Sequence, residues 1–467
     1  MWKVRKPLHE QDLPECVQYL IIGTGAAGWA AHNAIMENDK KAKVFFITKE
    51  DIQPYSRPPM SKFMWWNKLA PDLKTLRYFD EKYKTMYMTS CETFMDPVKF
   101  YRKKTGPATS IASGWCVTRI DAENHVVYLK TLCGERPMYY ERCLIAVGSK
   151  ANQLNMFKIA PKTVREKVTT FRTIRDLENA FRKVRSARHV TIIGAGPLGC
   201  ELAWFLGKMM DTEDEEKPPL EIVHMYKDGG VLGNVLPEYL GEWAAEKIKC
   251  EGVRMMPKIN ATALVCVGAS PRMDLAEPSC LEKDDLNGGF AVNTELMART
   301  HLYAAGDAAS FFSQWKNTRQ RFQNIVPAEE QGTLAGYNMT GYWEPCNVEQ
   351  SYWLKLGESI EMQMQVDLPA KDAAAEAELP CYKDSAEYKE RYKRGLLCYL
   401  RDETIVGFVF WNMPPIDDRK GVATEILRAR PHYKDINLIA DLLGFPETHC
   451  VFLKPEEVVE QGPCIRA

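Results

Sequence analysis

The feature that most constrains the fold of this chain is a spaced pattern of glycines that occurs twice. The first copy runs from Gly23 to Gly28 and the second from Gly194 to Gly199, each in the form G-x-G-x-x-G. Each copy follows a short apolar run and opens a helix-favouring stretch that leads to a second apolar run. This order of strand, tight turn, helix and strand predicts two βαβ units of similar plan, each with a parallel sheet.

Each glycine of the first copy has a mechanical task. Gly23 permits the tight turn, Gly25 lets the backbone approach a pyrophosphate, and Gly28 allows the helix to pack closely. Glu50 lies 22 residues after Gly28 (50 − 28), at the end of the next apolar run, where a carboxylate accepts hydrogen bonds from ribose hydroxyls. A lone glycine pattern is weak evidence, but this context predicts a dinucleotide-binding fold.

The second copy repeats this arrangement at Gly194, Gly196 and Gly199. Asp228 lies 29 residues after its last glycine (228 − 199). A carboxylate at this place repels a 2′-phosphate, so the sequence favours NAD(H) over NADP(H), although the adjoining Lys227 weakens that preference.

Two glycine patterns could also belong to a scaffold that binds one ligand. Apolar strands at 144–148 and 302–307, which end in small residues, favour a flavoprotein with two dinucleotide domains. Asp307 could accept a hydrogen bond from a ribityl hydroxyl. Two prolines stiffen the expected loop from Arg57 to Lys62, which would carry these cations towards a pyrophosphate and a flavin ring.

Several segments carry a closer resemblance, namely 234–240, 288–296, 306–309, 334–341 and 399–412. In this order they resemble the apoptosis-inducing factor family, over about residues 17–443. The resemblance implies an α/β protein with two Rossmann-type dinucleotide-binding domains, the glutathione-reductase-like flavoprotein fold, and a C-terminal α+β domain. The expected divisions are an FAD-binding domain from 1–160 and 271–345, an NAD(H)-binding domain at 161–270, and a C-terminal domain at 346–467 with a mobile loop near 370–390.

The resemblance also implies the site residues. FAD would be held by the first glycine pattern together with Glu50, Arg57, Lys62, Arg172 and Asp307. NAD(H) would be held by the second glycine pattern together with Asp228, Gly268 and Trp353. Val117 is expected to be a further cofactor-binding residue. Lys62 and Glu201 are expected to form a catalytic ion pair beside the flavin.

Three departures from the family pattern affect the nicotinamide side of this site. Gln323 and Asn324 stand where vertebrate relatives carry a Glu-His pair, and Gln363 stands where a Glu is usual. The stretch at 257–263 is also shorter than the family pattern. The nicotinamide contacts are therefore expected to differ from those of the family.

The function implied is NADH oxidation by hydride transfer to FAD, with a homodimer formed on reduction. The family further implies respiratory maintenance, caspase-independent apoptosis, an import or assembly partner, and a place in the mitochondrial intermembrane space with release to the cytosol and nucleus. The alternatives are a ferredoxin- or quinone-type NADH reductase, and a DNA-binding death effector with a mainly structural flavin.

Composition and charge limit these alternatives. With 61 basic and 62 acidic residues the net charge is −1, which gives no overall field for a polyanion; Lys316, Arg319 and Arg321 form the only local basic cluster in a suggestive place. The 14 cysteines contain no C-x-x-C pair and none follows Gly28 closely, so neither a disulfide reductase nor a metal site is expected. No apolar run approaches the roughly 20 residues that span a bilayer, which predicts a soluble chain without a transmembrane segment.

Overall fold

The structure is a computed structural model that describes residues 9–65, 76–80, 82–132, 134–209, 220–227, 230–233, 235–257, 264–314, 316–357, 360–366, 374–375, 395–401, 403–413 and 418–444. The chain divides into two compact units, each assembled from three separate segments. The first unit comprises 1–59, 71–151 and 269–348, and the second comprises 60–70, 152–268 and 349–467. The finer domain divisions expected from the sequence stay predictions. Most of the loop expected near 370–390, and residues 258–263, lie outside the described residues.

The helices and strands of the first unit are η1 (Glu10–Asp12), β1 (Cys16–Ile22), α1 (Ala26–Asn38), β2 (Lys43–Thr48), β3 (Arg77–Asp80), β4 (Lys82–Thr85), η2 (Cys91–Thr93), α3 (Pro97–Arg102), β5 (Ala108–Ser113), β6 (Val117–Asp121), β7 (Val126–Lys130), β8 (Glu135–Ile145), β9 (Ser149–Ala151), β15 (Ala269–Pro271), β16 (Phe290–Ala291), β17 (Met297–Arg299), β18 (Leu302–Ala304), η3 (Gly306–Ala308), β19 (Ala309–Ser313), β20 (Thr318–Gln320) and α9 (Ile325–Met339).

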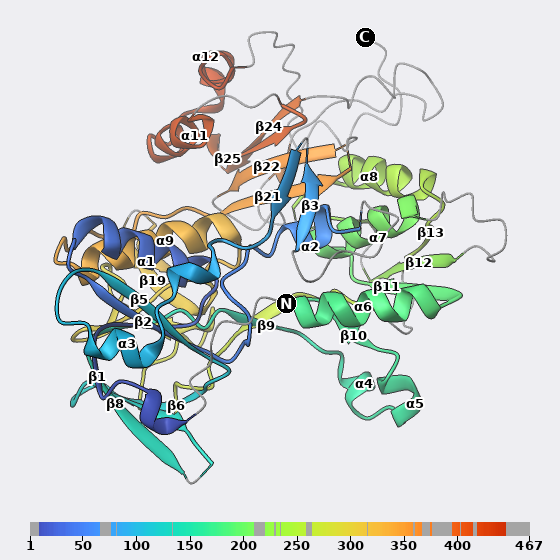
Figure 1. Cartoon of the computed structure of the whole chain (residues 1–467). Coiled ribbons are helices and arrows are strands. Elements are labelled where there is room, and N and C mark those ends of the chain that lie inside the picture. Colours follow the sequence, from blue (N-terminus) through green and yellow to red (C-terminus); the bar gives the residue numbers. More distant parts are fainter. Residues whose placement is uncertain are drawn as a thin grey trace, which may run out of the picture. The chain divides into compact units, whose positions relative to one another are not determined.

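An eight-stranded sheet forms the centre of the first unit (Figure 1). Its main path is β17-β18-β8-β1-β2-β5, with β6 and β7 attached through β8. The strand β1 pairs in parallel with both β2 and β8, and its last four residues are buried. Because a central parallel strand is covered on both faces, it needs a continuous apolar run, which the segment Tyr19–Ile22 supplies.

Helices α1 and α9 pack closely in this unit. A Cβ atom at Gly332 would lie 2.2 Å from the carbonyl oxygen of Ala27, and one at Gly336 would lie 2.5 Å from that of Ala31. Only glycine permits this approach, since a real Cβ cannot come so near a backbone oxygen. The contact brings the C-terminal segment of the unit against the helix of the first glycine pattern.

The helices and strands of the second unit are α4 (Asn155–Lys158), α5 (Lys162–Arg165), β10 (Thr169–Thr170), α6 (Ile174–Ser186), β11 (His189–Ile193), α7 (Pro197–Met209), β12 (Glu221–Tyr226), α8 (Glu238–Cys250), β13 (Arg254–Pro257), β14 (Leu264–Val265), β21 (Ser351–Leu356), β22 (Ile360–Val366), β23 (Ala374–Ala375), β24 (Gly395–Arg401), β25 (Thr404–Trp411), α11 (Arg419–Arg428), η4 (Tyr433–Asp435) and α12 (Ile436–Leu442).

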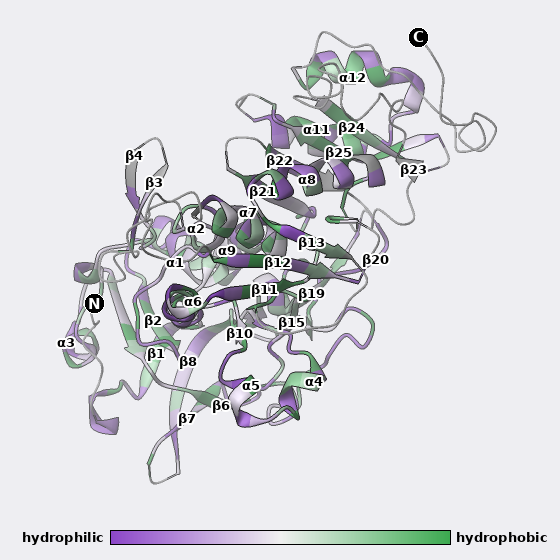
Figure 2. Ribbon diagram, turned by 90° about the vertical axis from the view of Figure 1, so that its right-hand side faces the viewer, coloured by the Kyte–Doolittle hydropathy of each residue, from purple (hydrophilic) through white to green (hydrophobic). Residues whose placement is uncertain are grey.

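The second unit contains a parallel sheet with the order β10-β14-β11-β12-β13. Helix α6 buries one stripe of residues, Ile174, Leu177, Ala180, Phe181 and Val184, at helical spacing. Helix α7 is buried over most of its length and is coloured mainly as hydrophobic in Figure 2. A mostly apolar helix of this kind fits between two layers of structure rather than at the surface.

The predicted order of strand, glycine turn, helix and strand is confirmed around both glycine patterns, by β1, α1 and β2 at the first and by β11, α7 and β12 at the second. Further along the chain, β24 and β25 form a hairpin in a five-stranded antiparallel sheet, β21-β22-β25-β24-β23. A 3₁₀ turn, η4, and the helix α12 follow α11.

One expected loop proved to be partly helical. Residues Pro59–Lys62 form the short helix α2. Proline is well tolerated in a first helical turn because its missing N–H has no partner there in any case. Pro59 therefore begins a helix where the sequence predicted a proline-stiffened loop. None of the described helices is long and apolar enough to cross a membrane.

Candidate cofactor-binding sites

The first fingerprint, Gly23–Gly28, forms the turn that its glycines predict. Gly23 has φ +111°, and a Cβ there would lie 2.2 Å from the carbonyl oxygen of Ala146. A Cβ on Gly28 would lie 2.3 Å from the carbonyl oxygen of Gly23. The first and third glycines are thus required by backbone conformation and by close packing, as expected.

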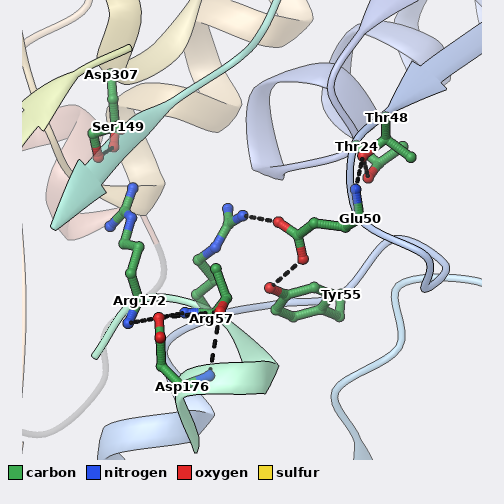
Figure 3. A network of polar contacts seen from close by, with 10 residues as sticks. Thr24, Thr48, Glu50, Tyr55, Arg57, Ser149, Arg172, Asp176 and Asp307 are labelled. Atoms are coloured by element: carbon green, nitrogen blue, oxygen red, sulfur yellow. Dashed lines mark hydrogen bonds and ion pairs between the residues drawn. The ribbon is translucent and has the colours of Figure 1, made fainter. Parts of the chain in front are cut away.

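Glu50 lies two residues beyond β2, and its carboxylate accepts two hydrogen bonds (Figure 3). The Tyr55 hydroxyl donates to Glu50 Oε2 at 2.7 Å, and Arg57 Nη2 donates to Glu50 Oε1 at 3.1 Å. About a third of the Glu50 side chain stays exposed. This carboxylate is therefore held in one orientation while it remains accessible, as a ribose-binding acid must be.

Arg57 lies directly over the first fingerprint. A Cβ added to Gly25 would come within 3.0 Å of Arg57 Nη1, which places the guanidinium at the glycine predicted to approach a pyrophosphate. Burial opposes its charge, but Tyr55, Glu50 and Asp307 outweigh burial and raise the pKa of Arg57. The buried Nε atom has no hydrogen-bond partner among the described residues. A fixed cation with a spare buried donor fits the pyrophosphate of FAD.

Asp307 is buried at the start of η3, and Ser149 Oγ donates to its Oδ2 at 2.6 Å (Figure 3). The preceding Gly306 has φ +76°, and its N–H donates to Gln331 Oε1 at 2.9 Å. The glycine conformation and the Gln331 amide therefore fix the turn that presents Asp307. Val117, on β6, is buried in the same unit.

The second fingerprint, Gly194–Gly199, reproduces the first. Gly194 has φ +122°, and a Cβ on Gly199 would lie 2.0 Å from the carbonyl oxygen of Gly194. A Cβ on Gly196 would meet no described atom within 4 Å, so the middle of the turn is open for a ligand. The pyrophosphate of a dinucleotide fits at this turn and the N-terminus of α7. Asp228, on which the choice of NAD(H) depends, lies outside the described residues.

The predicted ion pair between Lys62 and Glu201 is present in the second unit. Lys62 Nζ lies 2.7 Å from Glu201 Oε1. Ser61 Oγ donates to Glu201 Oε2 at 2.6 Å, and the Lys355 backbone N–H donates to Oε1 at 3.3 Å. The buried carboxylate thus has a charged partner and two further donors, which compensate for its removal from water.

An aromatic ring borders this pair. Lys62 Nζ lies 4.8 Å from the centre of the Trp353 ring, a cation–π distance, and the Trp353 indole N–H donates to Glu361 Oε1 at 3.0 Å. Gly268 follows β14 with φ +87°, and its carbonyl accepts the Asn152 N–H at 3.0 Å. The predicted contacts of Trp353 and Gly268 with nicotinamide stay predictions.

The predicted site residues are divided between the two units. The first unit contains Gly23, Gly25, Gly28, Glu50, Arg57, Val117 and Asp307, and the second contains Lys62, Arg172, Gly194, Gly196, Gly199, Glu201, Gly268 and Trp353. The Arg172 backbone N–H donates to Asp176 Oδ2 at 2.9 Å at the start of α6 (Figure 3). The roles of Lys62 and Arg172 towards FAD therefore stay predictions.

Four supporting residues were missed from the sequence: Tyr55, Ser61, Ser149 and Gln331. Tyr55 and Ser61 lie within a few residues of predicted site residues and could have been inferred as neighbours. Ser149 and Gln331 act on the Gly306–Asp307 turn from 158 and 25 residues away in the chain. No local pattern marks either of them.

Comparison with known families gives the class of the protein. Residues 17–263, more than half of the chain, match the pyridine nucleotide-disulphide oxidoreductase family. The chain belongs to this family, which confirms the predicted two-dinucleotide-domain fold class and the prediction of FAD and NAD(H) as cofactors. It also confirms the predicted class of enzyme, an FAD-dependent oxidoreductase that uses NADH.

Two relatives carry the resemblance further. The chain is 31% identical to a mitochondrial apoptosis-inducing factor 1 of Drosophila melanogaster, over 93% of this chain and 66% of the relative. It is 28% identical to the mitochondrial apoptosis-inducing factor 1 of Dictyostelium discoideum, over 95% of this chain and 84% of the relative. The predicted resemblance to this family is therefore confirmed, although the chain spans less than two thirds of the length of the fly protein.

Solved structures agree on the fold. The covalent putidaredoxin reductase–putidaredoxin complex matches 91% of this chain and 99% of the solved chain with a TM-score of 0.70 and 16% identity. The NADH:rubredoxin oxidoreductase of Clostridium acetobutylicum matches 90% of this chain and 97% of its own with a TM-score of 0.63 and 18% identity. At these identities the likeness supports the fold alone.

Proposed function

We propose that this protein oxidises NADH, with FAD held by the first fingerprint and NADH by the second. The observation that carries the proposal is the repeated turn geometry in two different surroundings. The first fingerprint has a cation, Arg57, and two carboxylates, Glu50 and Asp307, grouped around it. The second is open at Gly196. The first fingerprint thus has the charged side chains that would retain a tightly bound cofactor. The second leaves room for a nucleotide that binds and dissociates.

The residues of this chain would bind and orient the two cofactors. Arg57 would neutralise the pyrophosphate of FAD, while Glu50 and Asp307 would accept from ribose and ribityl hydroxyls. When bound, FAD supplies the two-electron acceptor for the hydride of NADH. Lys62, fixed between Glu201 and Trp353, is proposed to place its positive charge beside the flavin ring.

The finer biological role is proposed from the two apoptosis-inducing factor relatives. It comprises a mitochondrial location, in the intermembrane space, with respiratory maintenance and an import or assembly partner. It also includes a homodimer on reduction, and release to the cytosol and nucleus in caspase-independent apoptosis. These relatives support the mitochondrial location through their names; the other parts follow from the resemblance alone.

A second candidate function is electron transfer to a small redox protein. A rubredoxin-NAD(+) reductase of Pseudomonas putida is 23% identical over 72% of this chain. The apoptosis-inducing factor relatives match more of the chain at higher identity, which favours the first proposal. Steady-state NADH oxidation with a rubredoxin, a ferredoxin, a quinone and oxygen as acceptors would separate the two.

The DNA-binding alternative receives little support. Arg319 Nη1 donates to the backbone carbonyls of Val292 and Ser310, and Arg321 Nη1 donates to the carbonyl of Asp307. Two of the three cationic side chains of the basic cluster are thus engaged in hydrogen bonds to the backbone of the same unit. A salt-dependent gel shift beside the NADH assay tests this alternative.

The disulphide chemistry in the family name is not proposed for this chain. Disulphide reductases of this fold need a pair of closely spaced cysteines after the first fingerprint, and the first cysteine after Gly28 is Cys91. Cys200, the cysteine within α7, is not part of a disulphide and is fully buried. Burial raises the pKa of the Cys200 thiol well above its usual range, which disfavours the reactive thiolate.

The proposal is tested on the purified protein by releasing its flavin and measuring NADH consumption. No His or Cys of the chain is predicted to be flavinylated, so acid or heat should release FAD. The FAD-loaded protein should then oxidise NADH in the presence of an artificial electron acceptor. A colourless protein that cannot be reconstituted with FAD would refute the proposal.

A further inference from the structure

A histidine lies beneath the second fingerprint and contacts its backbone. His224, on β12, is fully buried, and its Nε2 lies 2.9 Å from the carbonyl oxygen of Gly194. A carbonyl can only accept, so Nε2 carries the hydrogen and donates it. The other ring nitrogen, Nδ1, is buried and has no hydrogen-bond partner among the described residues. The ring is therefore neutral, with one tautomer selected by the Gly194 carbonyl.

The same position of the first fingerprint has no such donor. In the parallel pairing of β1 and β2, Ile21 is opposite Phe46, and in that of β11 and β12, Ile192 is opposite His224. The two turns are otherwise held alike: the Gly23 N–H donates to the Ile47 carbonyl at 2.8 Å, and the Gly194 N–H donates to the Met225 carbonyl at 2.8 Å. Of the two matched positions, Phe46 and His224, only His224 can donate a hydrogen bond to the turn above it. The second turn therefore has one additional polar contact.

This contact fixes the orientation of one peptide group. The imidazole holds the Gly194 carbonyl inward, and in a trans peptide the following N–H, that of Ala195, points the opposite way. The Gly194 N–H is held at the same time by Met225. Both sides of the glycine are thus tied to β12. An inward carbonyl keeps a partial negative charge away from the place where a pyrophosphate would approach the turn.

We propose that His224 is a positioning residue for NAD(H), which keeps the second fingerprint in the conformation that accepts the dinucleotide pyrophosphate. The inference rests on the proposed function, in which the second fingerprint binds NADH. It adds that the imidazole hydrogen bond, and not merely the bulk of a buried side chain, sets the affinity. FAD, proposed to bind the first fingerprint, should be unaffected.

The test compares His224→Gln with His224→Met in the FAD-loaded protein. These side chains are similar in length, but only glutamine keeps an N–H donor. NADH affinity is measured by anaerobic calorimetry on protein whose FAD has first been reduced with dithionite, so that no hydride can pass to the flavin, and FAD content and the thermal midpoint are measured alongside. We expect H224M to raise the Kd for NADH by about fivefold or more and H224Q to stay within about twofold of the parent protein. If H224M does not fold, His224→Phe, which copies Phe46, takes its place.

A matched control comes from the first unit. Phe46→Leu loosens the corresponding position beneath the first fingerprint and should leave the Kd for NADH unchanged. The proposal is overturned if H224M binds NADH as well as H224Q, or if both weaken equally, or if Phe46→Leu has the same effect. Failure of the parent protein to bind NADH would instead contradict the proposed function, so the two failures are distinguishable.

Discussion

Lys62 and Glu201 lie 139 residues apart in the sequence, yet they form a buried ion pair with a separation of 2.7 Å between Nζ and Oε1. Their side chains are only 6% and 3% exposed. Removing one partner leaves the other charge buried without compensation, which typically costs about 3–5 kcal/mol. The Ser61 hydroxyl donates a hydrogen bond to the other carboxylate oxygen of Glu201, which limits how far this side chain could move if Lys62 were removed.

We expect Lys62→Met and Glu201→Gln to destabilise the protein strongly as single changes, and the double variant to lose less than their sum. Denaturant unfolding of the four proteins gives the coupling free energy. If the pair lies beside the flavin as proposed, Lys62→Met should also lower the flavin midpoint potential, because a nearby cation favours the anionic reduced flavin. Strict additivity in both stability and potential would contradict a functional pair.

An exposed pair in the same unit provides the control. Lys208 Nζ lies 3.6 Å from Glu251 Oε2, with the lysine side chain 51% exposed. Solvent screens such a pair, so a Lys208→Met change should cost about 1 kcal/mol or less and leave the flavin potential unchanged. A loss as large as that of Lys62→Met would show that burial is not what makes the Lys62 pair important.

The sequence predicted the parts of the fold that local patterns determine. The glycine spacing of both fingerprints predicted the turns, because only glycine adopts the φ values of Gly23 and Gly194. The apolar runs predicted β1 and β11, since buried parallel strands need them. The resemblance to the family predicted the Lys62–Glu201 contact, which no local pattern could have supplied.

What the sequence could not predict are side chains that act across the fold. Gln331, on α9, accepts a hydrogen bond from the Gly306 N–H, and His224, on β12, donates one to the Gly194 carbonyl. In the sequence alone, neither can be told from an ordinary buried residue. The segment from Arg57 to Lys62 was wrongly expected to be a proline-stiffened loop throughout, because a proline in a loop and a proline in a first helical turn look the same in sequence.

Asp307→Ala should weaken FAD binding by roughly tenfold or more, since it removes an acceptor for a ribityl hydroxyl. Asp284→Ala is a matched control. Asp284 is likewise buried and accepts from a serine, Ser310 Oγ, at 2.6 Å, but it is not a predicted cofactor residue. Quenching of FAD fluorescence on binding to the apoprotein gives both affinities. Equal weakening by the two changes would contradict a direct role for Asp307.

Asp228 should make NADH a better reductant than NADPH, because its carboxylate accepts from the ribose and repels a 2′-phosphate. Asp228→Ala should narrow this preference by roughly tenfold or more, which corresponds to the loss of one hydrogen bond and one repulsion. Rates of flavin reduction with both nucleotides provide the measurement. Equal rates in the unmodified protein would refute the prediction.

His224 should make the protein less stable in acid. Burial lowers the pKa of His224 to about 4, from 6.5, while the hydrogen bond to Gly194 opposes this shift only in part. Between these values the unfolded chain binds a proton that the folded protein excludes, so stability is full above pH 6.5 and falls as the pH drops to 4. The loss amounts to about 3 kcal/mol at most. His224→Met should flatten this part of the stability profile, measured by denaturant unfolding, and an unchanged slope would contradict the assignment.

The most direct test of the central claim, that NADH reduces an FAD bound by this chain, is an anaerobic absorption titration of the purified protein. We predict flavin bands in the visible region before the addition, and their loss on adding one equivalent of NADH. The same amount of NADPH should act more slowly. A flavin that keeps its oxidised spectrum after excess NADH, although dithionite bleaches it, would contradict the account.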